Sequence, residues 1–470
     1  MHYVSTRGEA PRLSFTDAML AGLARDGGLY VPESFPQLSA AAIAGFAGLP
    51  YAKVAEAVIG PFTGGDIAGG DFRAMLEASY ATFRHDAVTP LVQIDDNVFV
   101  LELFHGPTLA FKDVAMQLLG RMMDHALKSR GQRATIVGAT SGDTGAAAIE
   151  AFRGLDQVDV FILYPHGRVS DVQRRQMTTV PDSNIHTIAL EGTFDDAQAI
   201  LKGLFNNHGF RDELGLSGVN SINWARVVAQ AVYYFTAAVA LGGPHRPVSF
   251  TVPTGNFGDI LAGWIAKKMG LPIERLAIAT NSNDILARTL ASGDYRTAGV
   301  HATQSPSMDI QVSSNFERLL FDAYDRDAGS IRRLMANLQQ SGGFSIDAGP
   351  LARIRTEFDA GSCDEAQTQA EIRRTFERTG YILDPHTAVA THVARAQVAR
   401  NPRVPMVALS TAHPAKFPDA VSKATGRKPE LPGHLADLFE RKERFTVLAN
   451  DIGKIEAFVR AHARAAKAPA

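Results

Sequence analysis

The chain has 470 residues, of which 46% are hydrophobic and 20% charged, and its formal net charge at pH 7 is -2. This length predicts two or three structural units, and the nearly balanced charge argues against nucleic acid or an anionic membrane as a partner. A single cysteine, Cys363, cannot form an internal disulfide, and the first residues lack the pattern of a secretory signal, so we expect a cytoplasmic protein.

The first 80 residues predict an appended unit of short helices and loops. Further along, the most apolar run, Val227 to Gly243, is interrupted by Gln230 and Thr236. It is shorter than the roughly 20 apolar residues that a bilayer span needs. We therefore expect a buried helix there and no membrane association.

From residue 97 onward, apolar runs alternate with amphipathic runs, which predicts strands and helices in turn. Three consecutive strand–helix units favour a parallel sheet with helices on both faces, and a second series begins after a long helix. The sequence thus predicts an α/β fold with two parallel-sheet halves and a cleft between them. The predicted smaller half covers about 105–215, the larger half about 216–430 together with 81–104, and 431–470 form a C-terminal helical segment with a frayed tail.

Two glycine-rich connections, Gly138 to Ala148 and Pro253 to Asp259, each join a predicted strand to a predicted helix. Free backbone N–H groups at such a helix start bind anions such as phosphate. Neither connection matches the nucleotide-binding P-loop, and neither half opens with a dinucleotide fingerprint. Asp259 would repel a phosphate, so we expect it to cap its own helix and face away, although packing alone can also explain such turns.

The segment "HGPTLAFKD" (105–113) places Lys112 at another turn before a helix. A lysine near a phosphate-binding loop suits a Schiff base with pyridoxal phosphate, in which the amine is first an anchor and later a base. An ordinary surface lysine remains the alternative from this segment alone.

Eight segments together extend this interpretation: "HGPTLAFKD", "ATSGDTGAAA", "NSIN", "PTGNFGD", "ATNSND", "SPSMDI", "DPHTAVA" and "STAHPAKF". In order and spacing they resemble threonine synthases, which are pyridoxal-phosphate enzymes of fold type II. The resemblance covers nearly the whole chain, and residues 1–80 resemble the extension of the bacterial and fungal type. It implies a carbon–oxygen lyase that converts O-phospho-L-homoserine and water to L-threonine and phosphate, the last step of threonine biosynthesis.

The resemblance also implies roles for individual residues. Lys112 resembles the catalytic Schiff-base lysine, and Asp143 stands where relatives often have asparagine beside the cofactor hydroxyl, which leaves the protonation state of that hydroxyl open. The remaining cofactor-binding candidates are Gly255, Asn256, Phe257, Gly258, Asp259 and Thr411. The candidates for substrate binding are Thr140, Ser141, Gly142, Thr144, Asn223 and Arg226, with Thr108 and Lys416 as weaker ones.

Several alternatives stay open from sequence. The same scaffold could carry a threonine or serine dehydratase or an O-phosphohomoserine phospho-lyase, and a non-catalytic cofactor-binding protein is a different class. Arg226 could be an ordinary cation on a helix surface. We assign no catalytic role to His105, His386 or His413, expect no metal site, and expect a monomer or small homo-oligomer.

Overall fold

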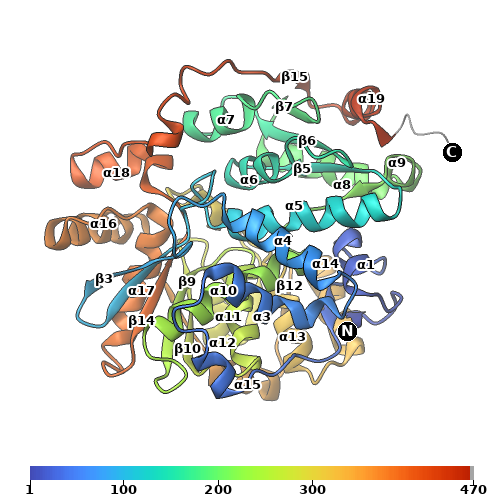
Figure 1. The fold of residues 1–470 in the computed structure, drawn as a ribbon. Coiled ribbons are helices and arrows are strands. Elements are labelled where there is room, and N and C mark those ends of the chain that lie inside the picture. Colours follow the sequence, from blue (N-terminus) through green and yellow to red (C-terminus); the bar gives the residue numbers. More distant parts are fainter. Residues whose placement is uncertain (466–470) are drawn as a thin grey trace.

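The computed structural model describes residues 1–465; the last part of the predicted frayed tail, 466–470, lies outside the described residues. Two mainly parallel sheets with helices on their faces form the two halves, as the sequence predicts (Figure 1). The five-stranded sheet lies toward the top of Figure 1, and the larger half lies below it. None of the helices within residues 1–465 is long and apolar enough to cross a membrane.

The larger half is built on a six-stranded sheet with the order β13-β10-β9-β14-β4-β3, in which only the edge pair β3 and β4 is antiparallel. Its strands are β3 (Leu91–Asp95), β4 (Val98–Glu102), β9 (Val248–Pro253), β10 (Ile273–Thr280), β13 (Phe358–Ser362) and β14 (Met406–Ser410). Its helices are α10 (Trp224–Ala240), α11 (Gly258–Lys268), α12 (Ile285–Ser292), α13 (Phe316–Ala323), α14 (Ala328–Ser341), α15 (Ala348–Glu357), α16 (Glu365–Thr379), α17 (Pro385–Val398) and α18 (Pro418–Thr425). The short 3-10 turns η1 (Pro306–Met308) and η2 (Pro414–Lys416) and the antiparallel pair β11 (Asp294–Arg296) and β12 (Gly343–Ser345) complete it.

The smaller half contains a fully parallel sheet with the order β15-β7-β6-β5-β8. Its strands are β5 (Ala134–Ala139), β6 (Val158–Pro165), β7 (Ile185–Glu191), β8 (Leu216–Ser217) and β15 (Thr446–Ala449). Its helices are α5 (Lys112–Ser129), α6 (Asp143–Phe152), α7 (Asp171–Thr178), α8 (Phe194–Asn206), α9 (His208–Leu214) and α19 (Ile452–His462), and η3 is Gly433–Leu435. Every residue of β6 is buried, as expected for a central parallel strand covered on both faces.

The sequence predicts only helix and a frayed tail for the C-terminal segment, but in the structure this segment also contains the strand β15. This strand pairs in parallel with β7 and extends the sheet of the smaller half by one edge strand. Its side chains are partly exposed, so the stretch lacks the continuous apolar pattern that marks a buried strand.

The long helix α10 confirms the prediction of a buried helix, since almost all of its side chains are shielded from solvent. It packs against α11 in the larger half and against α5. Helix α5 in turn packs against α6 in the smaller half, so α5 lies between elements of both halves (Figure 1). Lys112, the first residue of α5, is therefore placed where the two halves meet.

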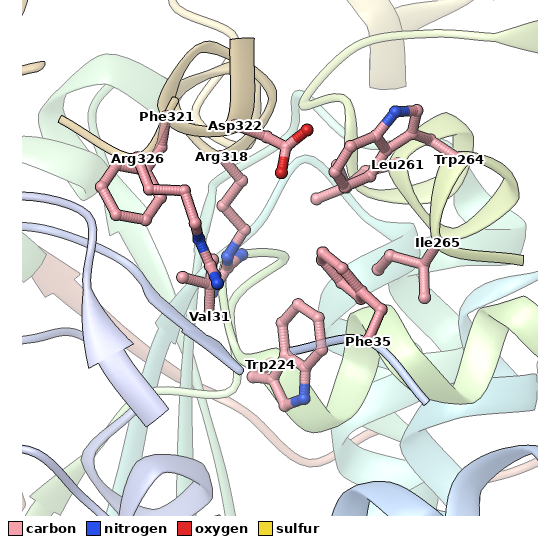
Figure 2. Close-up of a pocket in the computed structure, with 10 residues that line it drawn as sticks. All are labelled: Val31, Phe35, Trp224, Leu261, Trp264, Ile265, Arg318, Phe321, Asp322 and Arg326. Atoms are coloured by element: carbon pink, nitrogen blue, oxygen red, sulfur yellow. The ribbon is translucent and has the colours of Figure 1, made fainter. Parts of the chain in front are cut away.

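The N-terminal segment consists of β1 (Tyr3–Ser5), α1 (Phe15–Ala21), β2 (Tyr30–Pro32), α2 (Ala40–Ala44), α3 (Tyr51–Thr63) and α4 (Gly69–Tyr80). It is attached to the larger half by specific contacts, because Arg318 of α13 donates to the Tyr30 carbonyl and Thr6 donates to Glu317 at 2.6 Å. Figure 2 shows a small pocket at this junction, where Val31 and Phe35 approach Trp224 of α10. Its lining is mainly apolar and includes none of the predicted site residues.

Candidate active site

The turn that carries Lys112 is fixed by backbone hydrogen bonds to the chain leaving β14. The Phe111 N–H donates to the Thr411 carbonyl at 2.9 Å, and the His413 N–H donates to the Leu109 carbonyl at 3.0 Å. Leu109 has a left-handed backbone with φ of 62°, which a leucine adopts only when its surroundings impose it. The structure therefore brings Lys112 close in space to the segment of Thr411, about 300 residues later in the chain.

Lys112 is buried and faces the carboxylate of Asp143, with 3.6 Å between Nζ and Oδ2. A second ammonium, that of Lys416, lies 2.7 Å from the other carboxylate oxygen and is fully buried. Gln173 adds a hydrogen bond of 2.9 Å to the same oxygen. Burial acts to raise the pKa of Asp143, but the two ammonium groups and the hydrogen bonds hold it well below its ordinary value. Asp143 is therefore an ionised carboxylate.

Burial lowers the pKa of Lys112, and the positive charges of Lys416 and Arg226 lower it further, whereas Asp143 acts in the opposite direction. A lysine with a lowered pKa is more readily a free amine near neutral pH, which is the form that acts as a nucleophile or a base. The side chain also lies 5.0 Å from the centre of the Phe111 ring. Lys112 is thus a buried, positioned amine and is not an ordinary surface lysine.

Residues Gly255 to Gly258, named here the 255–258 loop, connect the end of β9 to the start of α11. Phe257 has a left-handed backbone with φ of 63°, and such a reversal turns successive N–H groups toward one side. Within residues 1–465, these four backbone N–H groups form no hydrogen bond with the protein. Buried or semi-buried N–H groups at a helix start need a partner, and a phosphate satisfies them. Gly255 is required locally, since a Cβ there would lie 2.8 Å from the Ser307 carbonyl oxygen.

The expectation that Asp259 caps its own helix is wrong. Phe257 occupies the N-cap position of α11, and the Asp259 side chain instead accepts hydrogen bonds from Tyr233 and, at 3.1 Å, from Tyr234 of α10. Burial raises the pKa of Asp259 to about 7, although the tyrosines and Lys112 act to lower it. Its second oxygen, Oδ2, is buried and has no partner among the described residues. A carboxyl group with this pKa is partly protonated at neutral pH, which lessens its repulsion of a phosphate.

The second glycine-rich turn, Thr140 to Thr144, is named here the Asp143 loop. Thr140 Oγ1 accepts hydrogen bonds from the N–H groups of Gly142 at 2.9 Å and of Gly145 at 3.0 Å. Gly142 has φ of 139°, and a Cβ there would lie 2.4 Å from the side chain of Gln173, so only glycine fits. Ser141 and Thr144 are partly exposed at the start of α6. Their hydroxyl groups are the part of this loop that can reach a ligand.

Arg226 is buried in α10, so the alternative of a surface cation is wrong. It donates to the Val219 carbonyl at 2.8 Å, but its Nε has no partner and it forms no salt bridge with any residue in 1–465. Burial lowers the pKa of Arg226 to about 10, which still leaves it charged at neutral pH. A buried guanidinium without a carboxylate partner is costly unless an anion binds to it.

Asn223 and Thr108 are already engaged within the protein. The Asn223 carbonyl caps α10 through the Ala225 N–H, and its amide donates to the Met19 carbonyl at 2.8 Å. The Thr108 hydroxyl donates to the Asp113 carboxyl at 2.6 Å, and the Thr108 backbone N–H donates to the other oxygen of that carboxyl at 2.8 Å. Both residues therefore stabilise the site through hydrogen bonds to other parts of the protein.

The three histidines near the site are hydrogen-bonded. His105 lies 2.7 Å from Glu102, His386 joins Asp384 at 2.9 Å, and His413 accepts from the Ala415 N–H at 3.1 Å. Burial lowers the pKa of His413 to about 4, so it is neutral at physiological pH. Among residues 1–465, no cluster of histidine, cysteine and carboxylate side chains could hold a metal ion.

A cavity of about 450 Å³ lies beside the Lys112 turn and is lined in part by Leu109, Phe104 and His413. Sequence reasoning missed Gln173, which contacts Asp143, and Ser307, whose Oγ lies 3.5 Å from the same carboxylate. Ser307 belongs to the segment "SPSMDI", so the motif marked the region without showing which side chain it contributes.

Comparisons with known proteins identify the same family along nearly the whole chain. Three family models match: "Threonine synthase N terminus" at 2–80, "Pyridoxal-phosphate dependent enzyme" at 82–411 and "Threonine synthase, C-terminal" at 387–459. The threonine synthase of Pseudomonas aeruginosa is 54% identical and covers 99% of this chain and 100% of its own length.

Two crystal structures are also similar. The pyridoxal-phosphate-bound threonine synthase from Brucella melitensis is 62% identical with a TM-score of 0.97, covering 99% of this chain and 100% of its own. The yeast threonine synthase is 40% identical with a TM-score of 0.93 and covers 98% of both chains.

Proposed function

Since the chain belongs to the threonine synthase family, and so uses pyridoxal phosphate to convert O-phospho-L-homoserine and water to L-threonine and phosphate, we propose that Lys112 is its reactive amine. The observation that carries this assignment is the Lys112 side chain itself: buried, with a lowered pKa, at a helix start beside Asp143. The amine anchors the cofactor and is then released to move protons on the substrate.

Bound pyridoxal phosphate supplies an aldehyde that condenses with amines and a ring that withdraws electrons from the attached substrate. The 255–258 loop is the proposed holder of its phosphate, through the four N–H groups that have no partner within residues 1–465 and the partial positive charge at the start of α11. Asp259 lies directly behind this loop, where its raised pKa limits charge repulsion. The chain therefore fits the cofactor's phosphate with backbone groups alone.

Asp143 and Thr411 are the proposed contacts of the cofactor ring. Asp143 is ionised, so it can accept a hydrogen bond from a ring hydroxyl. Thr411 offers a neutral hydroxyl for the ring nitrogen, and a neutral partner does not hold that nitrogen protonated as a carboxylate would. This pairing gives a milder electron sink than an aspartate at the nitrogen.

Lys112 is the proposed base at the substrate. As a free amine it can take the proton from Cα and later a proton from Cβ, since these steps occur in sequence. Loss of the γ-phosphate follows removal of the Cβ proton, and Cγ then gains a proton to become the methyl group. Water adds its oxygen at Cβ and gives up one proton, Cα regains its proton, and Lys112 is the proposed carrier of these protons. One amine serves each step because its protonation alternates between them.

The substrate anions have separate proposed partners. The hydroxyl groups of Ser141 and Thr144, and the backbone of Gly142 with Thr140 behind it, suit the substrate carboxylate. Arg226, a buried cation without a carboxylate partner among the described residues, suits the substrate phosphate. We also propose a cytoplasmic location, which the single cysteine supports, and a monomer or small homo-oligomer.

The test is a product assay on purified protein with O-phosphohomoserine as substrate. We expect threonine and phosphate in equal amounts from the wild type and neither from Lys112→Ala, with Lys423→Ala, an exposed lysine on α18, as the matched control. Phosphate accompanied by 2-oxobutyrate in place of threonine would indicate a dehydratase or phospho-lyase. Threonine formation at the wild-type rate by Lys112→Ala would overturn the assignment of Lys112.

A further inference from the structure

Lys416 links three segments of the site through one ammonium group. Its Nζ donates to the Asp143 carboxylate at 2.7 Å and to the Thr108 carbonyl at 2.8 Å, and the side chain has no exposed surface. Thr108 lies in the turn before Lys112, and Asp143 begins α6. The ammonium of Lys416 is thus held in place from two sides.

Positively charged groups outnumber ionised carboxylates around Lys112. The ionisable groups that face it are Asp143 from α6, Lys416 from η2, Arg226 from α10 and Asp259 from α11. Asp143 is the firmly ionised carboxylate of this set, because burial raises the pKa of Asp259 to about 7. If Lys112 were protonated as well, three cations would share the negative charge of Asp143.

The geometry decides which cation Asp143 holds. The contact of 2.7 Å to Lys416 is a charge-assisted hydrogen bond, whereas the 3.6 Å to Lys112 is too long for one. We propose that Lys416 is a positioning residue: by pairing with Asp143 it prevents that carboxylate from holding Lys112 as an ammonium. The proposal rests on the assignment of Lys112 as the reactive amine.

This arrangement has a consequence for both ends of the pair. Asp143 stays charged and stays beside the proposed cofactor ring, and because it is paired with Lys416 it stabilises the protonated form of Lys112 less strongly. Without Lys416, Asp143 would attract Lys112 instead and stabilise its protonated form. With Lys416 in place, its pairing with Asp143 therefore affects the reaction although Lys416 does not contact the substrate.

The pH dependence of Lys112 reactivity tests the proposal on the full-length chain freed of cofactor. Acetic anhydride reacts with neutral amines, so the extent of Lys112 acetylation against pH, read by peptide mass spectrometry, gives the midpoint of its deprotonation. The variants are Lys416→Met, Lys416→Arg and Asp143→Asn, with Lys423→Met on the exposed face of α18 as the control.

We expect opposite shifts from the two partners. Lys416→Met should raise the Lys112 midpoint by about one pH unit or more, because the carboxylate is freed to pair with Lys112. Asp143→Asn should lower it by a similar amount, because the countercharge is lost and Lys416 remains. Lys416→Arg and Lys423→Met should leave it close to wild type.

Two results would overturn the proposal. An unchanged midpoint in Lys416→Met would show that Lys416 does not govern the protonation of Lys112. Upward shifts in both Lys416→Met and Asp143→Asn would show that each substitution loosens the site and admits water. Lys416 would then have a structural role only. The threonine assay of Lys112→Ala reports separately on the assignment of Lys112 itself.

Discussion

The Asp143 loop and the 255–258 loop have the same position in their halves, yet they handle charge in opposite ways. Each joins the end of a parallel strand to the start of a helix. In the Asp143 loop, Thr140 accepts two of the N–H groups, and the Asp143 carboxylate supplies the negative charge that the helix start favours. In the 255–258 loop, the N–H groups have no partner within residues 1–465.

This difference separates two kinds of anion site that look alike in sequence. In the Asp143 loop the Asp143 carboxylate holds cations of the chain itself, here Lys112 and Lys416, and the hydroxyl groups of the loop remain for a ligand. The loop without one remains suited to an anion from outside the chain. A glycine-rich turn therefore predicts a place for charge, while the residues around it decide which charged groups bind there.

Removal of the carboxylate from the Asp143 loop should have the largest effect on stability. Asp143→Ala leaves Lys416 buried without its counterion, so we expect the free energy of unfolding to fall by about 3–5 kcal/mol in urea denaturation. Glu213→Ala, which breaks an exposed pair with Arg460, is the control and should cost about 1 kcal/mol or less. Equal losses in the two variants would contradict the buried charge network.

The carboxyl behind the 255–258 loop should make stability depend on pH. The folded pKa of Asp259 is about 7, above its ordinary 3.8, so the folded chain keeps a proton that the unfolded chain releases. The resulting stability is present below about pH 4 and is lost as the pH rises through about 7, a change on the order of 4 kcal/mol.

Asp259→Asn should remove most of this dependence, as measured by urea denaturation between pH 4 and pH 8. A smaller slope should remain from Asp113, since burial raises its pKa to about 6. If the variant and the wild type have parallel stability profiles, Asp259 is not protonated in the folded protein.

The sequence predicts the helices and turns of this site better than the side-chain contacts between them. Lys112 at a helix start and the two glycine-rich turns follow from local patterns, and in the structure a helix begins at or within each of these segments, as predicted. The bond between Lys416 and Asp143 joins positions far apart in the chain, so periodicity and motif spacing contain no sign of it.

Two further features depended on packing that local patterns do not contain. The sequence favours Asp259 as a helix cap because aspartate is common at that position, but in the structure two tyrosines on α10 donate to its carboxyl instead. Arg226 is buried although arginine is usually exposed, since α10 is covered on nearly all sides. Tertiary contacts decided both outcomes.

A methyl group in the 255–258 loop should weaken cofactor binding. Gly255→Ala places a Cβ 2.8 Å from the Ser307 carbonyl, so the loop must shift and its N–H groups lose their common direction. We expect the dissociation constant for pyridoxal phosphate to rise at least about tenfold, or about 1.4 kcal/mol, in a fluorescence titration.

Gly60→Ala in α3 is the control, because a Cβ there meets its nearest neighbour at an ordinary 4.0 Å. Its affinity for the cofactor should match the wild type. An unchanged affinity in Gly255→Ala would place the cofactor phosphate elsewhere.

The smallest effect should come from the exposed hydroxyl of the Asp143 loop. Ser141→Ala removes one hydrogen bond to the substrate carboxylate, worth roughly 0.5–1.5 kcal/mol, so we expect KM to rise about two- to tenfold with little change in kcat. Ser129→Ala at the far end of α5, where the hydroxyl bonds its own helix, should leave both constants unchanged. A fall in kcat with constant KM would assign Ser141 to the chemical step instead.

The most direct test of the account asks which buried lysine carries the cofactor. Borohydride reduction of the purified holoenzyme fixes the cofactor to its lysine, and peptide mass spectrometry then locates the added mass. We predict the phosphopyridoxyl group on Lys112, the lysine that Asp143 holds less closely. The same group on Lys416 would contradict the assignment of the two lysines, and with it the division of charge at Asp143.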